Sequence, residues 1–231
     1  MTTDQVVAAI CCAAVAGAIG LVVPRALARL PEPEEADADK PAYAALASTR
    51  GLGGWAAGAA AVVAGSIGAV LGADWSLPAW VYLSVVGVTL GFVDWHTKLL
   101  PYRIVAPSYV VVGLLLGVAA VVTQDRGAAT RAVIAWVGAF AMFYLLNLIH
   151  PAGMGYGDVR LSGLLAMALG WLGWVELMVG LYAGFLLGAV VGGILALARV
   201  VDRKSYPFGP FMLAGAWVGV VAGPLTSSWW A

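Results

Sequence analysis

The sequence predicts an all-α polytopic membrane protein with about eight transmembrane helices and both termini on the extracytoplasmic side. Of its 231 residues, 62% are hydrophobic and only 10% are charged, whereas a soluble domain carries about 25% charged residues. Continuous apolar stretches recur along the chain, each long enough to cross the hydrocarbon core of a bilayer. A transmembrane barrel would show short alternating segments instead. The net charge is zero, so nothing indicates a nucleic-acid partner.

The first four predicted spans alternate with short polar segments, except for one longer connection. The spans cover about residues 6–23, 51–71, 79–93 and 104–122. Residues 24–50 are expected to form a cytoplasmic acidic loop, most of it a flexible solvated linker. Its five carboxylates have no His or Cys beside them, so neither a metal site nor a cofactor is expected there. They are Glu32, Glu34, Glu35, Asp37 and Asp39.

The second half of the chain is expected to hold four further helices. The fifth covers residues 130–149, and the segment from 159 to 200 is too long for one span. Polar and aromatic residues around Trp171–Glu176 suggest a break, which leaves a short sixth helix and a seventh over 177–200. The eighth ends near Pro224.

Glycines recur at four-residue spacing in the seventh predicted helix, at Gly180, Gly184, Gly188 and Gly192. Residues at this spacing share one helix face, so they let a neighbouring backbone approach closely. Close helix packing is the favoured interpretation, and a substrate groove is the alternative.

The distribution of basic residues supports the predicted orientation. Ten of the twelve lie in loops assigned to the cytoplasm, and only Arg126 and Arg131 fall outside. Cytoplasmic loops of membrane proteins carry an excess of Lys and Arg. Two of the ten cytoplasmic residues, Lys98 and Arg103, could contact lipid headgroups or stabilise Asp94, and contact with headgroups is the favoured interpretation.

Two aspartates at the edges of apolar runs are the candidate functional residues. Asp94 ends the third run, and Asp158 follows Gly155, Tyr156 and Gly157 before the next run. A carboxylate at membrane depth indicates a functional site. Two adjacent carboxylates share a proton, so one can activate water while the other protonates a peptide carbonyl. The alternative is a tight loop in which Asp158 acts only as a helix N-cap.

The glycines before Asp158 are candidate substrate-binding residues. Gly155 and Gly157 have no side chain, so a substrate backbone can come close to them. An extended peptide could pair there by strand addition.

Four blocks of this sequence resemble the bacterial type IV prepilin leader peptidases, which are intramembrane aspartic proteases with a Gly-x-Gly-Asp motif. They are residues 29–31 (Arg-Leu-Pro), 94–101 with the first aspartate, 155–161 with the second, and 207–211 (Pro-Phe-Gly-Pro-Phe). The order and spacing of the blocks also fit, and they extend over essentially the whole chain. The resemblance therefore implies a single transmembrane peptidase domain over residues 1–231.

The resemblance implies an endopeptidase in the bacterial cytoplasmic (inner) membrane, serving type IV pili or protein secretion. It would cut the N-terminal leader from prepilins or pseudopilins at the cytoplasmic face, with Asp94 and Asp158 as the catalytic pair. Pro207, Phe208 and Gly209 are expected to help bind the substrate.

The chain also departs from the family pattern. Full-length members carry two Cys-x-x-Cys pairs that bind zinc in the first cytoplasmic loop, and this loop has no cysteine. Zinc is therefore not expected, and the N-methyltransferase activity of some members is not assumed. Tyr102 stands where Asn or Asp is common, and Arg160 replaces Lys.

Two other functions compete with the peptidase hypothesis. A transporter or channel would use Asp94 and Asp158 as proton or cation ligands, with a helix broken at the glycines. A non-catalytic assembly factor would bind prepilins without cutting them.

Overall fold

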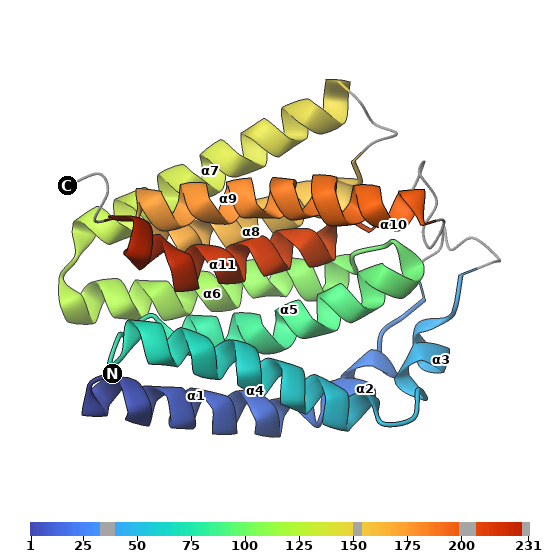
Figure 1. Ribbon diagram of the computed structural model, residues 1–231, viewed down its shortest axis with the longest axis horizontal. Coiled ribbons are helices and arrows are strands. Elements are labelled where there is room, and N and C mark those ends of the chain that lie inside the picture. Colours follow the sequence, from blue (N-terminus) through green and yellow to red (C-terminus); the bar gives the residue numbers. More distant parts are fainter. Residues whose placement is uncertain (33–39, 150–153, 199–206, 228–231) are drawn as a thin grey trace. The chain divides into compact units, whose positions relative to one another are not determined.

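A computed structural model describes residues 1–32, 40–149, 154–198 and 207–227, and every regular element in these ranges is a helix (Figure 1). The chain divides into two compact units, Met1–Thr97 and Lys98–Ala231. The first contains α1 (Thr3–Gly20), α2 (Val23–Leu27), α3 (Tyr43–Ala47), α4 (Leu52–Leu71) and α5 (Leu77–Thr97). The second contains α6 (Tyr102–Thr123), α7 (Arg126–Ile149), α8 (Tyr156–Leu172), α9 (Trp174–Leu187), the π-helix η1 (Gly188–Gly192), α10 (Gly193–Leu197) and α11 (Gly209–Ser227).

Small residues bring α1 and α4 into close contact in the first unit. A Cβ atom added to Gly20 would lie 2.6 Å from the Cα atom of Ala57, and one added to Gly68 would lie 2.8 Å from the carbonyl oxygen of Ala8. Glycine and alanine allow two apolar helices to approach to this distance, which gives dispersion contacts that larger side chains would prevent.

The segment between α1 and α4 is more structured than the expected polar loop. Helices α2 and α3 flank residues 33–39, which lie outside the described residues and include four of the five loop carboxylates. Leu27, Tyr43 and Leu46 are buried in one cluster with Val93 of α5. This apolar burial outweighs the polar composition of the surrounding sequence.

The remaining loop carboxylate, Glu32, caps α3. Its two oxygens accept hydrogen bonds from the backbone N–H groups of Tyr43 (3.0 Å) and Ala44 (3.3 Å). These groups have no partner within the helix, and a carboxylate also interacts favourably with the helix N-terminus. Burial, followed by the charge of Glu32, raises the pKa of Tyr43.

The long helices follow the predicted order, and six of those in the described ranges are long and apolar enough to cross a membrane. These six are α1, α4, α5, α6, α7 and the segment Trp174–Gly192. The other two predicted spans correspond to α8, with 17 residues, and to the apolar part of α11, Gly209–Pro224. The total of eight spans and the extracytoplasmic position of both termini stay predictions.

Helix α8 forms the centre of the second unit. It contacts α6, α7, α9 and α11, and 13 of its 17 residues are buried. The predicted break after it is confirmed, since Gly173 separates α8 from α9. A helix surrounded by other helices is apolar on nearly all sides, so its composition alone resembles that of a lipid-facing span.

The predicted glycine face packs closely against α11. A Cβ atom added to Gly219 of α11 would lie 2.9 Å from the Cα atom of Gly180, and the backbones of Gly184 and Gly215 are also in contact. This confirms close packing for Gly180 and Gly184. The seventh predicted helix is not uniform, because α9 passes into η1 at Gly188 before α10. Its last two predicted residues, 199 and 200, lie outside the described residues.

Candidate functional site

Asp158 lies in the first turn of α8 and is buried, with 8% of its surface exposed. Gly155 is the N-cap residue, so Asp158 occupies the third helical position and is not itself the N-cap. Its carboxylate oxygen Oδ2 accepts a hydrogen bond from the N–H of Gly155 at 3.2 Å. The prediction that Asp158 is the N-cap residue is therefore wrong, although its carboxylate does accept a hydrogen bond from the N-cap N–H; this contact does not prevent a catalytic role.

The two glycines of the motif have different surroundings. Gly155 uses its N–H for the Asp158 carboxylate and its carbonyl for the N–H of Asp158, at 3.0 Å. Both of its backbone groups are therefore occupied, which argues against strand addition at Gly155. A Cβ atom added to Gly157 would lie 2.9 Å from the Cβ atom of Leu100. Gly157 is therefore needed for close packing.

Asn147 fixes the residue before the motif. Its side-chain amide donates a hydrogen bond to the carbonyl oxygen of Met154 at 2.7 Å. The end of α7 therefore helps to position the start of α8.

Asp94 lies within the last turn of α5, and only 4% of its surface is exposed. The helix continues three residues beyond the predicted end of the apolar run at this aspartate, to Thr97, whose hydroxyl donates to the carbonyl of Val93 at 2.8 Å. His96 contacts the carbonyl oxygen of Phe92 through Nδ1 at 2.8 Å. Asp94 is thus a buried carboxylate at a helix end in the first unit, and Asp158 is a second one in the other unit.

The block Pro207-Phe208-Gly209 leads into α11. Pro207 is buried, Gly209 is the first residue of α11, and the carbonyl of Phe208 accepts from the N–H groups of Phe211 (3.1 Å) and Met212 (3.2 Å). The ring of Phe208 lies 5.7 Å from the ring of Phe185. Phe208 therefore occupies the N-terminal end of α11 and faces α9.

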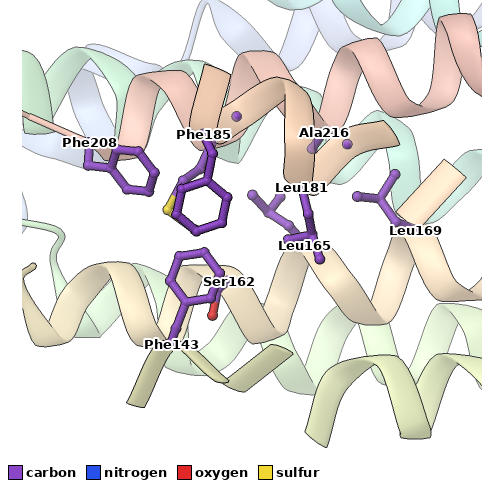
Figure 2. A pocket seen from close by; sticks show the side chains of 11 residues that line it. Phe143, Ser162, Leu165, Leu169, Leu181, Phe185, Phe208 and Ala216 are labelled. Carbon is purple, nitrogen blue, oxygen red and sulfur yellow. The ribbon is translucent and has the colours of Figure 1, made fainter. Parts of the chain in front are cut away.

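A small apolar hollow lies beside these aromatic rings (Figure 2). Phe143, Phe185 and Phe208 line it together with Ser162, Leu165 and Leu169 of α8, and Ser162 lies beside Phe143. These α8 residues follow Asp158 by four, seven and eleven positions, so all four share one helix face. Ser162 lies only about 6 Å further along the helix axis than Asp158.

The sequence reasoning missed the contacts that link the start of α6 to α8. Arg160 lies between the rings of Tyr102 and Tyr156, with its guanidinium carbon 4.6 Å and 4.3 Å from their centres. Tyr102 and Arg160 both depart from the resembled pattern, and the structure shows that they touch. Their common deviation was a signal that the sequence offered.

Within the described part of the chain, no three His, Cys, Asp or Glu side chains form a group that could hold a metal ion. Four loop carboxylates are outside that part, so the absence of a metal or cofactor stays a prediction.

Comparison with known proteins identifies the family of the chain. The model of the type IV leader peptidase family matches residues 81–197, which include Asp94 and Asp158. This chain belongs to the type IV leader peptidase family. The assignment confirms the resemblance found from the four sequence blocks. The matched range ends before Pro207, so it does not extend to the Pro-Phe-Gly block.

Relatives within the leader peptidase family include long and short proteins. The chain is 29% identical over 175 residues to a prepilin leader peptidase/N-methyltransferase of Aeromonas hydrophila, which covers 74% of this chain and 58% of that protein. It is 30% identical over 158 residues to the Aeromonas salmonicida protein of that name, covering 68% and 53%. It is also 34% identical over 149 residues to the leader peptidase HopD of Escherichia coli, covering 63% and 93%.

The chain thus spans little more than half the length of the two Aeromonas relatives. No solved structure matches it.

Proposed function

We propose that this chain is an intramembrane aspartic endopeptidase that removes the N-terminal leader of type IV prepilins or pseudopilins. The family assignment and the names of the relatives support a protease acting on prepilin-like proteins. The membrane setting agrees with six helices that are long and apolar enough to span a bilayer. Cleavage is proposed at the cytoplasmic face of the bacterial inner membrane, without a nucleic-acid partner and with Lys98 and Arg103 on lipid headgroups.

The proposed catalytic pair is Asp94 and Asp158. The observation that carries the proposal is that Asp94 and Asp158 both lie inside the family-matched range and are both buried at helix ends, whereas Asp125 in the same range is exposed. Leu100, which packs against Gly157, follows Asp94 by only six positions in the sequence, and this short connection supports the pairing. In the shared-proton state, the ionised carboxylate takes a proton from water while the protonated one donates to the peptide carbonyl oxygen.

Substrate binding is proposed at two places beside Asp158. Gly155 and Gly157 form the first place: an added side chain at Gly155 would meet only its own turn, so a peptide backbone can approach the carboxylate from that side, while Gly157 packs against Leu100 next to it. Phe208, which stands between Pro207 and Gly209, lines the apolar hollow, and the α8 residues of this hollow share the helix face of Asp158; these three residues are the second proposed place. We propose that this hollow takes an apolar side chain of the pilin segment next to the cleaved bond, because burial of apolar surface favours such a ligand.

The test uses the purified chain in lipid nanodiscs with a full-length prepilin. The wild-type protein is expected to shorten the prepilin, while Asp94→Asn and Asp158→Asn each abolish cleavage because neither amide can exchange the proton. Asp4→Asn is the matched control, since Asp4 is an exposed carboxylate in the first turn of α1. It is expected to cleave as well as the wild-type protein.

Two outcomes would contradict the peptidase proposal. Cleavage that persists in either active-site variant removes that residue from the catalytic pair. An intact prepilin together with proton or cation flux in liposomes indicates the transporter, and binding without cleavage or flux indicates the assembly factor.

A further inference from the structure

Arg160 is held between two aromatic rings close to Asp158. We call Tyr102, Arg160 and Tyr156 the tyrosine–arginine stack; its two ring-to-guanidinium distances are 4.6 Å and 4.3 Å. The tyrosines are 59% and 44% exposed, so these rings do not simply fill a core. A cation over an aromatic face is attracted by the ring electrons, and more strongly where water is excluded.

The position of this cation is unfavourable for the helix that carries it. Arg160 is the fifth residue of α8, and a positive charge near a helix N-terminus opposes the helix dipole. The negative faces of the two tyrosine rings offset part of this cost. We therefore infer that Arg160 at this position stabilises the contact between α8 and α6, and that it does not act on the stability of α8 alone.

Two further contacts join the start of α6 to the same turns of α8. Leu100 packs against Gly157 so tightly that a Cβ atom there would lie 2.9 Å away. The hydroxyl of Tyr109 donates a hydrogen bond to the carbonyl oxygen of Arg160. Contacts at positions 157 and 160 thus bracket Asp158, and they fix both the rotation and the axial position of the turn that carries it.

We propose that Arg160 is a positioning residue for the reaction, acting with Tyr102 to hold the Asp158 carboxylate in its working geometry. This inference rests on the proposed peptidase function. Displacing a catalytic group by about 1 Å can reduce a rate by about a hundredfold, because the reacting atoms lose their alignment. Tyr102 lies far from Asp158 along the chain, but it contacts Arg160, which follows Asp158 by two residues. The stack therefore controls this alignment through the backbone of α8.

The experiment measures kcat and KM for prepilin cleavage in nanodiscs. Tyr102→Leu is expected to lower kcat about tenfold, and Arg160→Met up to about a hundredfold, since it loses both ring contacts while keeping an apolar stem. KM should stay within about twofold, because neither side chain binds the substrate in this proposal. Tyr102→Phe keeps the ring face and Arg160→Lys keeps the cation, so both should restore most of the rate.

A double variant tests whether the two residues act through one contact. Tyr102→Leu combined with Arg160→Met should be no slower than Arg160→Met alone, because the contact is already lost. Rate losses that simply multiply would overturn the proposal. The midpoint temperature of thermal unfolding of each variant, measured in the same nanodiscs, must lie well above the assay temperature. A kcat loss that is explained by the unfolded fraction would also overturn the proposal.

Tyr182→Leu is the matched control, since Tyr182 of α9 is 73% exposed and lies outside the stack. This variant should leave kcat unchanged.

The positioning proposal and the peptidase proposal would be contradicted by different results. If the wild-type protein does not cleave, or Asp158→Asn does, the peptidase function is wrong. If wild-type cleavage depends on Asp158 but Tyr102→Leu and Arg160→Met match the wild type, only the positioning role is wrong.

Discussion

At the scale of single residues, the surroundings of Asp158 depend on two neighbouring glycines, which have no side chains. Gly155 gives its N–H to the carboxylate, and the missing side chain of Gly157 admits Leu100. The motif therefore combines a hydrogen bond to Asp158 with a packing contact next to it. The two glycines are not equivalent, although the sequence presents them as a symmetric pair.

Gly157→Ala is expected to strain the first turn of α8. Its new Cβ atom would lie 2.9 Å from the Cβ atom of Leu100, which cannot move without moving the backbone. Overpacking of this kind costs about 1–3 kcal/mol, so thermal unfolding in detergent should occur at a lower temperature. Gly54→Ala is the control, because no atom lies within 4 Å of its added Cβ. Equal stability of the two variants would contradict this packing.

At the scale of elements, the acidic loop shows how a local polar sequence can contribute to a core. Tyr43 and Leu46 of α3 are buried although the loop sequence is rich in carboxylates and proline. Glu32, eleven residues before Tyr43, supplies the cap. Sequence patterns at N-termini are usually sought within three residues, so this long-range cap was not predicted.

Glu32→Ala should release the N-terminus of α3. Loss of a capping side chain costs about 1 kcal/mol, so hydrogen exchange at the amides of Tyr43 and Ala44 should become about fivefold faster. Amides within α4 provide an internal control and should exchange at an unchanged rate. Unchanged exchange at both α3 amides would show that Glu32 does not stabilise this helix.

At the scale of the whole molecule, the sequence expectation concerns orientation in the membrane. Cytoplasmic loops carry most Lys and Arg residues in such proteins, and this places Lys98 inside and Arg126 outside. Both residues are exposed at helix connections. The orientation matters because it assigns the ends of α5 and α8 that carry the aspartates to the cytoplasmic face.

Single cysteines at these two positions test the orientation. In a background with Cys11→Ala and Cys12→Ala, Lys98→Cys should react with a membrane-impermeant maleimide only from the cytoplasmic side. Arg126→Cys should react only from the opposite side. Labelling of Lys98→Cys from outside would reverse the topology and remove the active site from the cytoplasmic face.

Much of the architecture followed from the sequence. The order of the long helices, the break that the structure places at Gly173, the close glycine contact of α9 and the two carboxylates at helix ends were all predicted. These features depend on local chemistry, because a backbone in hydrocarbon must satisfy its own hydrogen bonds and so forms helices. A carboxylate or a glycine in an apolar run can likewise be recognised from the sequence, because it differs from the large apolar residues around it.

Only the tertiary structure decided which helix is central and which residues surround Asp158. An apolar sequence does not distinguish a helix face that meets lipid from one that meets protein, since both environments favour the same side chains. The burial of α8, the π-helix at Gly188 and the stacking of Tyr102 on Arg160 depend on packing between distant segments. Such contacts have no local signal, because complementary shape is set by the two surfaces together.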